Sequence, residues 1–140
     1  MIRPYEDRDF QDCRWLNDQS YLKPCPENEL RAKLAGKTWV WEDSPQVIGC
    51  LITEVHQERP RDIGKTFIWS VTVSPNWRNR GIATALLGKA AEYFAGTELW
   101  LHTTPGSPAE RLYTKLGYTA VEIDYDFYGP GSDSVLMVKR

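Results

Sequence analysis

Residues 71–84 have the side chains and the spacing of an anion-binding site. An apolar strand runs into a polar turn, and the turn opens an amphipathic helix. The first backbone amides of such a helix have no partners inside it and carry the positive end of the helix dipole. Arg78 and Arg80 add charge, while Gly81 and Ala83 leave a ligand's oxygens room to reach the backbone. The stretch therefore predicts a phosphate or pyrophosphate site, the alternative being an ordinary strand-to-helix turn with two solvated arginines.

Alternating strands and helices are expected to position this loop. The expected strands are residues 2–5, 38–41, 46–57, 67–73, 99–103, 118–125 and 134–139. The expected helices are residues 9–17, 26–36, 81–94 and 108–116. Asp9 and Ser107 are the expected N-caps of the first and last helices. The pattern predicts an α/β (α+β) fold, with a mixed central sheet of about six to seven strands flanked by about four helices.

Length and composition limit the classes of protein that this chain can represent. Its 140 residues and the lack of repeats or linkers predict one domain over residues 1–140. A net charge of −2 argues against a nucleic-acid binder, and no apolar run approaches the ~20 residues of a membrane span. The three cysteines have no metal-ligand spacing, so we expect no metal site. Together with the absence of a signal peptide, these features predict a soluble, cytoplasmic protein.

Two motifs resemble those of a known family. Arg78-x-x-Gly81-x-Ala83 is similar to the acetyl-CoA motif of the GNAT (GCN5-related) N-acetyltransferases, written Arg/Gln-x-x-Gly-x-Gly/Ala. About thirty residues later the family has a Leu-Tyr-x-Lys-x-Gly-Phe signature. The matching segment here reads Leu112-Tyr113-x-Lys115-Leu116-Gly117-Tyr118. The resemblance implies a GNAT fold and an N-acetyltransferase that uses acetyl-CoA as co-substrate and needs no metal.

The resemblance also implies how acetyl-CoA is held. Backbone groups of Val71 and Val73 would pair with the pantetheine arm like an additional strand. The pyrophosphate would be held by a run of six positions: Arg78, Asn79, Arg80, Gly81, Ala83 and Thr84. Many relatives have an Asn before the late helix that contacts CoA. This chain has none there, and Ser107 is the candidate to replace it.

Catalysis needs a neutral amine and a proton for the leaving thiolate. Tyr113 matches the family tyrosine that donates this proton, although its helical spacing also suits a core aromatic. His102 is the candidate general base, since its strand resembles that of protein N-terminal acetyltransferases, which carry Glu or His there. A buried histidine satisfied by its neighbours is the alternative. Glu54 is a weaker candidate base or substrate-binding residue, and His56 is weaker still.

The amine acceptor is the least defined partner. The Phe127-Tyr128 pair and the strand after it resemble the end of protein N-terminal acetyltransferases, where Tyr128 would bind a peptide backbone. A protein N-terminal α-amine is therefore slightly preferred over a small-molecule amine such as a polyamine, an amino acid or an aminoglycoside. A non-catalytic acyl-CoA-binding module and a loop for another nucleotide are the rival functions. The family's fold is often dimeric, which adds a homodimer to the candidate partners.

Charges are segregated along the chain despite the near-neutral total. The charged side chains of residues 63–91 are all basic, and those of residues 116–138 are all acidic. The basic block contains the predicted pyrophosphate loop. We expect the acidic block, with Asp124 and Asp126, to face a cationic acceptor.

Overall fold

The computed structural model describes residues 1–20 and 24–140. The chain forms two compact units, residues 1–54 with 68–93 and residues 55–67 with 94–140. The first unit contains β1 (Ile2–Pro4), α1 (Phe10–Ser20), α2 (Glu27–Leu34), β2 (Thr38–Asp43) and α3 (Ile82–Tyr93). It also contains nearly all of β3 (Gln46–Val55) and most of β4 (Thr66–Val73). The predicted loop thus lies in the first unit, between β4 and α3.

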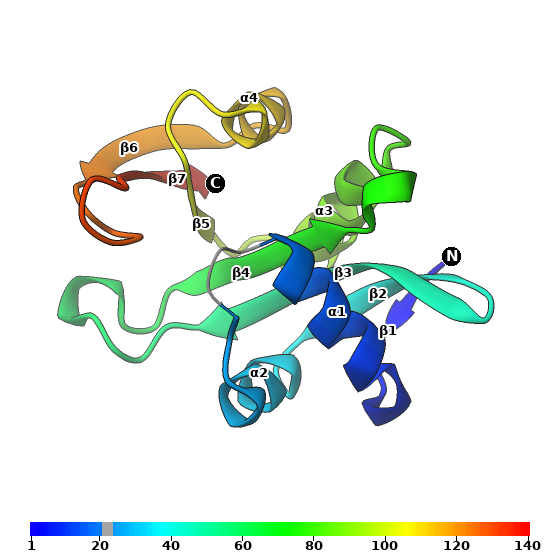
Figure 1. Ribbon diagram of the computed structural model, residues 1–140. Coiled ribbons are helices and arrows are strands. Elements are labelled where there is room, and N and C mark those ends of the chain that lie inside the picture. The colour runs from blue at the N-terminus through cyan, green and yellow to red at the C-terminus, as the bar shows by residue number, and fades with distance from the viewer. Residues whose placement is uncertain (21–23) are drawn as a thin grey trace. The chain divides into compact units, whose positions relative to one another are not determined.

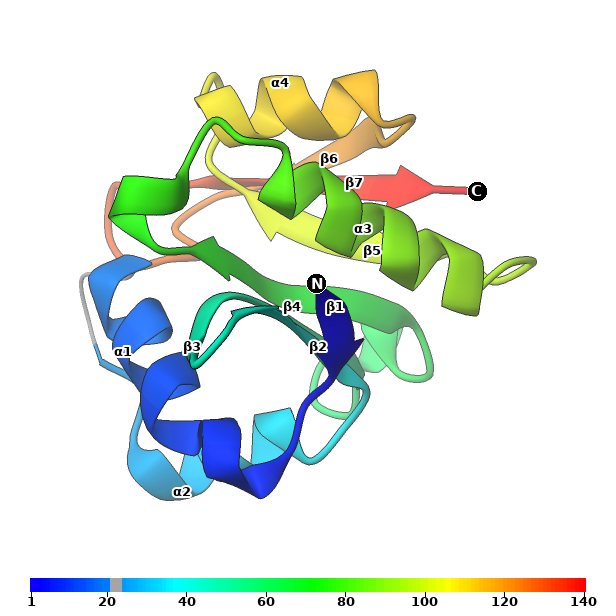
Figure 2. The same ribbon diagram turned by 90° about the vertical axis from the view of Figure 1, so that its right-hand side faces the viewer.

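Helices cover both faces of the sheet in the first unit, whose strands follow the order β1-β2-β3-β4 (Figure 1). Successive side chains of a strand point to opposite faces. On one face Val40 and Ile52 pack with Leu16 of α1 and Leu34 of α2 in one apolar cluster. On the other face the Trp39 ring lies 5.3 Å from that of Tyr93 in α3. Figure 2 shows α3 and the α1–α2 pair on opposite sides of these strands.

The second unit contains β5 (Leu99–Thr103), α4 (Pro108–Lys115), β6 (Thr119–Asp124) and β7 (Ser134–Lys139). The first two residues of β4 pair in parallel with β5. β7 is antiparallel to both β5 and β6. Buried side chains from β4, β5 and β7 form an apolar cluster in the second unit: Phe67, Trp100, Leu136 and Val138. β7 therefore lies between β5 and β6 in the second unit and is antiparallel to both.

The predicted fold class is confirmed, with seven strands that include parallel and antiparallel pairs and with four α-helices in the described residues. Gly117 ends α4 with a φ of 97°, and Ser107 caps it by accepting a hydrogen bond from Glu110 N. The prediction for Asp9 is wrong: its carboxylate accepts from Glu6 N at 2.8 Å and pairs with Arg3. It therefore closes a preceding 3-10 turn (Asp7–Asp9). The single domain over 1–140 stays a prediction.

None of the helices in residues 1–20 and 24–140 has the length and apolarity that a transmembrane span requires.

Candidate acetyl-CoA and acceptor site

The loop between β4 and α3 has a backbone that only a few residue types adopt easily. Ser74 N donates to Ile48 O at 2.8 Å, which ties the end of β4 to β3. After a 3-10 turn (Pro75–Trp77), Asn79 and Gly81 have φ angles of 62° and 81°. Glycine adopts this left-handed region freely and asparagine tolerates it. α3 begins directly after Gly81, at Ile82.

The loop is open at Gly81 and carries two arginines. A Cβ built on Gly81 would meet no atom within 4 Å, so the backbone there is open. Arg78 and Arg80 have no carboxylate within 4 Å among the described residues. Arg80 lies over the Trp77 ring at 4.9 Å. Open amides at a helix N-terminus and two uncompensated guanidinium groups are what a pyrophosphate requires.

Three further residues predicted to hold the cofactor, Val71, Val73 and Thr84, also lie in the first unit, whereas Ser107 lies in the second. Val71 and Val73 are half-buried, and Thr84 is exposed in the first turn of α3. Arg78 Nε donates to the Val73 carbonyl at 3.1 Å. A pantetheine amide that donates to this carbonyl would share the carbonyl with Arg78 or displace the Arg78 side chain from it.

Glu54, the predicted substrate-binding residue, forms an ion pair with Lys33 of α2. Both side chains are about one-fifth exposed. The Lys33 ammonium also lies 5.4 Å from the centre of the Trp69 ring. Sequence reasoning missed Lys33, because a lysine on an amphipathic helix usually faces solvent.

His102 lies in the second unit between two phenylalanine rings. The Phe127 ring is stacked on it at 3.8 Å between centroids, and the Phe67 ring lies on its other side at 5.6 Å. His102 Nδ1 is 2.7 Å from Ser134 Oγ. His102 Nε2 is 3.4 Å from Arg59 Nη1. Because a guanidinium only donates, Nε2 is the acceptor and Nδ1 carries the proton in this arrangement.

These surroundings oppose a positive charge on His102. Burial lowers its pKa to about 4, and the neighbouring Arg59 adds to this effect. The carboxylate of Asp124, 3.5 Å from Nδ1, acts in the opposite direction. The imidazole is therefore neutral at pH 7 but a weak base. The role of His102 as general base stays a prediction, and its lowered pKa argues against that role.

The acidic block is engaged within the second unit, which differs from the expected open surface. Arg61 forms ion pairs with Glu122 and, at 2.6 Å, with Asp124. The carboxylates of Asp126 and Asp133 accept hydrogen bonds from backbone N–H groups of the loop after β6. The local partners offset much of the negative charge that a linear sequence displays.

Asp62 is the buried anchor of the loop between β3 and β4. Its side chain is fully buried and accepts hydrogen bonds from Lys65 at 3.1 Å and Arg61 at 3.3 Å. Arg59 Nη1 lies 3.9 Å from it. Burial acts to raise the Asp62 pKa, but Lys65 and Arg61 together hold it below its usual value. The sequence predicted strands that end at residue 57 and begin at residue 67, with no element between them.

Tyr113, the predicted general acid, is buried on α4 and its ring meets that of Tyr118 edge to face at 5.7 Å. Burial raises the pKa of Tyr118 to about 12. The Tyr118 hydroxyl finds no hydrogen-bond partner in the described part of the chain.

Ser107 donates its hydroxyl proton to Thr104 O at 2.6 Å while it caps α4. That proton is therefore already used, which argues against the predicted contact of this hydroxyl with CoA.

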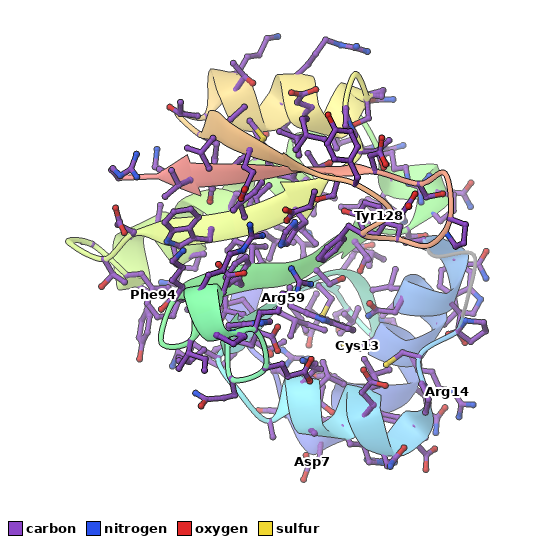
Figure 3. The ribbon with its side chains drawn as sticks, turned by 90° about the vertical axis from the view of Figure 1, so that its left-hand side faces the viewer. Asp7, Cys13, Arg14, Arg59, Phe94 and Tyr128 are labelled. Atoms are coloured by element: carbon purple, nitrogen blue, oxygen red, sulfur yellow. The ribbon has the colours of Figure 1, made fainter. Side chains whose placement is uncertain are left out.

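Tyr128 and Arg59 are two further features of the second unit (Figure 3). Tyr128 is about half exposed, and its ring meets Phe127 edge to face at 4.9 Å. Arg59 lies over the Phe127 ring at 4.2 Å. Sequence reasoning missed Arg59, because nothing along the chain indicates that a loop before β4 contacts the loop after β6.

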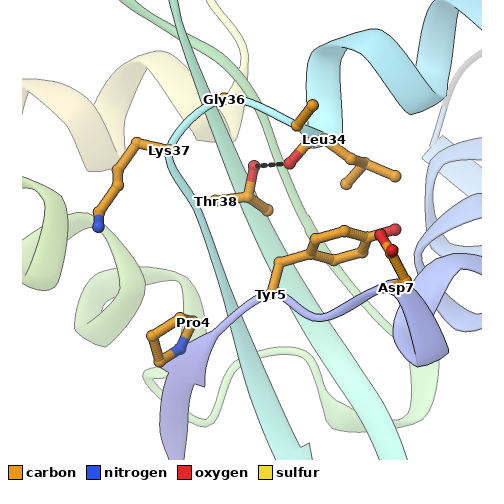
Figure 4. Close-up of a pocket in the computed structure, with 8 residues that line it drawn as sticks. Pro4, Tyr5, Asp7, Leu34, Gly36, Lys37 and Thr38 are labelled. Atoms are coloured by element: carbon orange, nitrogen blue, oxygen red, sulfur yellow. Dashed lines mark hydrogen bonds between the residues drawn. The ribbon is translucent and has the colours of Figure 1, made fainter.

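A separate hollow of about 300 Å³ lies in the first unit at the end of α2 (Figure 4). Tyr5, Asp7 and Lys37 contribute to its wall. Thr38 Oγ1 donates to Leu34 O at 3.2 Å beside it. None of the residues predicted to bind acetyl-CoA or the acceptor lines this hollow.

Comparison with known proteins identifies the family. The chain belongs to the acetyltransferase (GNAT) family, whose model matches residues 4–118. The two motifs at Arg78 and Leu112 fall inside this range, so the predicted family is confirmed.

Three curated relatives match parts of the chain. The N-alpha-acetyltransferase of Sulfurisphaera tokodaii is 29% identical over 110 residues, which cover 71% of this chain and 66% of that protein. The mycothiol acetyltransferase of Kocuria rhizophila is 34% identical over 96 residues, 66% of this chain and 30% of that protein. The cysteine-rich protein 2-binding protein of Mus musculus is 34% identical over 64 residues, 46% of this chain and 8% of that protein. The chain thus spans less than two thirds of the length of each relative.

Solved structures confirm the fold. The ribosomal-protein-S18-alanine N-acetyltransferase from Escherichia coli superposes with a TM-score of 0.82 at 18% identity, covering 99% of this chain and 92% of that one. Arabidopsis thaliana NAA60, in complex with acetyl-CoA, gives 0.81 at 20% identity and covers 99% and 96%. At these identities the likeness extends to the fold alone.

Proposed function

We propose that the protein transfers the acetyl group of acetyl-CoA to a primary amine by direct attack of the amine on the thioester. The observation that carries this proposal is the loop before α3, where Asn79 and Gly81 adopt positive φ angles beside two arginines that have no carboxylate partner in residues 1–20 and 24–140. This arrangement occurs at the position of the acetyl-CoA motif in a chain of the acetyltransferase family.

In this proposal the backbone amides of residues 78–84 hold the pyrophosphate, and the strand edge at Val71 and Val73 orients the pantetheine. Acetyl-CoA supplies the activated acetyl group as co-substrate. Tyr113 supplies a proton to the departing thiolate. No cysteine lies near either motif, so no acyl-enzyme intermediate is proposed.

The fate of the amine proton is the least constrained step. His102 would accept it, directly or through water, although its lowered pKa makes it a weak acceptor. Glu54 is the alternative base, and its ion pair with Lys33 would have to open. If His102 is the base, His102→Ala removes the acidic limb of the pH–rate profile, and an unchanged limb assigns the base elsewhere.

We propose a protein N-terminal α-amine as the acceptor, supported by the S. tokodaii relative and by the exposed Tyr128. A small-molecule amine is the second candidate, supported by the mycothiol acetyltransferase relative. Release of free thiol from acetyl-CoA, measured over a panel of peptides and a panel of small amines, separates the two. Activity confined to small amines would overturn the peptide preference.

The role of Tyr113 has its own test. Tyr113→Phe removes the phenolic proton and keeps the ring, so we expect kcat to fall by at least tenfold with little change in acetyl-CoA binding. Wild-type kcat in this variant would exclude Tyr113 as the acid. Titration with acetyl-CoA, ATP and NAD tests the loop, since a preference for ATP or NAD would contradict the proposed cofactor.

A further inference from the structure

We propose that Arg59 forms an anion subsite that selects acceptors carrying a carboxylate group. This inference rests on the proposed function, because it names the chemical class of acceptor for the same transfer. It is carried by the contacts of Arg59 in the second unit, a residue outside both family motifs.

Arg59 is the least neutralised of three cations around one buried carboxylate. Lys65 and Arg61 approach Asp62 to 3.1 and 3.3 Å, whereas Arg59 stays at 3.9 Å. Its guanidinium has five N–H donors, and its side chain makes one hydrogen bond in the described residues, at 3.4 Å to His102. About 39% of its side chain remains exposed. Most of its donor capacity is therefore open to a ligand.

The guanidinium is also held in place before any ligand arrives. One face lies over the Phe127 ring at 4.2 Å, and Phe127 is in turn stacked on His102. A planar cation fixed on an aromatic ring loses little further freedom when it binds a carboxylate with two parallel hydrogen bonds. The Arg59 fork is thus preorganised for a planar anion.

Apart from Asp62 at 3.9 Å, the nearby acids have partners other than Arg59. Arg61 forms the ion pairs of Glu122 and Asp124, and backbone N–H groups bind Asp126 and Asp133. His102 is neutral, with Nε2 as acceptor toward Arg59, so it supplies no counter-charge. The chemistry beside Tyr128 therefore favours an anionic group on the acceptor over the cationic group that the sequence suggested.

A carboxylate can come from a free amino acid or from an acidic side chain of a peptide, and two matched ligand pairs distinguish these sources. Protein with CoA is titrated calorimetrically with alanine against alaninamide, and with the peptide amides Ala-Asp-Ala against Ala-Asn-Ala. We expect the carboxylate member of one pair to bind at least tenfold tighter to the wild type. In Arg59→Gln this ratio should fall below twofold, mainly through weaker binding of the acid.

Two further variants separate recognition from structure. Arg59→Lys keeps the charge without the fork and should retain an intermediate preference. Arg14→Gln removes an arginine of similar exposure that pairs with Glu27 at 3.3 Å in the first unit, and it should keep the wild-type ratio. A wild type without preference in both pairs overturns the proposal. Equal weakening of both members in Arg59→Gln also overturns it, since Arg59 would then only position Phe127.

The same titrations distinguish this proposal from the proposed function. Failure of CoA to bind, or of any amine to release thiol from acetyl-CoA, contradicts the acetyltransferase. The acid-to-amide ratio, measured again without CoA, reports on Arg59 alone. A ratio that persists without turnover supports the subsite even where the transfer reaction fails.

Discussion

The loop before α3 and the cluster around His102 are built in opposite ways. The loop comes from about ten consecutive residues, and its chemistry lies in backbone amides presented by Asn79 and Gly81. The cluster joins side chains from four separate segments, among them Arg59, Asp124 and Ser134. A contiguous backbone site leaves a motif in the sequence. A cluster of distant side chains leaves none, so its electrostatics become visible only in the fold.

The largest expected effect concerns the charge state of the His102 cluster. The pKa of His102 is about 4 when folded and near 6.5 in an unfolded chain. Between these values the unfolded chain binds a proton that the folded protein does not. The free energy of unfolding should therefore fall by about 3 kcal/mol as pH drops from 6.5 to 4. Urea denaturation across this range measures it.

The control for this prediction is His102→Gln, which keeps a polar side chain and removes the titration. Its unfolding free energy should be nearly flat over the same range, because the buried Asp9 and Asp62 carboxylates have lowered pKa values and titrate below it. An equal pH dependence in both proteins would show that His102 is not the responsible group.

The next effect tests the backbone-built region. Gly81→Val places a β-branched residue at a φ of 81°, which costs about 1–2 kcal/mol and distorts the loop. We expect acetyl-CoA to bind at least tenfold more weakly, as measured by calorimetry. Gly96→Val is the matched control, since Gly96 has a φ of 84°, follows α3 and likewise has open space beside it. Equal loss of affinity in both variants would contradict a local role for the loop.

A smaller effect tests the ion pairs of the side-chain cluster. Arg61→Gln removes the partner of Glu122 and Asp124 and one of the cations on buried Asp62. Because Arg61 is itself 40% exposed, we expect a loss of only about 1 kcal/mol in unfolding free energy. Hydrogen exchange in residues 122–133 should become faster. Unchanged exchange there would indicate that Arg61 does not hold this segment.

The smallest effect concerns the buried hydroxyl of Tyr118. Since this oxygen has no hydrogen-bond partner in the described residues, Tyr118→Phe removes an unsatisfied polar group. We expect unchanged stability or a gain of up to about 1 kcal/mol, seen as an unchanged or higher Tm. A clear loss would reveal a partner for this hydroxyl.

Most of the fold followed from residue patterns along the chain. Period-two apolar runs and helical periodicity located the ends of the strands and helices within two residues, except that α1 extends to Ser20 and not to residue 17. The prediction for Asp9 was wrong because an aspartate before a helix suggests an N-cap, and the sequence does not show that its carboxylate pairs with Arg3 instead. Local periodicity is set by neighbours in the chain, so it can be read without the fold.

The candidate site was predictable only where its chemistry is local. The sequence indicated the phosphate-binding role of Gly81. It also indicated His102 as a candidate base, but not the side chains that surround it. The lowered pKa of His102 depends on burial and on Arg59, which lies 43 positions away in the chain. The acidic block appeared free for the same reason, because its partner Arg61 comes from another segment. Long-range pairing of side chains is decided by topology, which no motif records.

Acetyl transfer by this protein should depend on the loop before α3. Its most direct test is the release of CoA thiol from acetyl-CoA by wild type and Gly81→Val, side by side, with acetylated acceptor identified by mass spectrometry. We predict acceptor-dependent thiol release by the wild type, with the amine of the acceptor acetylated, and a strong loss of this activity in the variant at limiting acetyl-CoA. Tight acetyl-CoA binding without transfer to any peptide or small amine would contradict the account and identify an acyl-CoA-binding module.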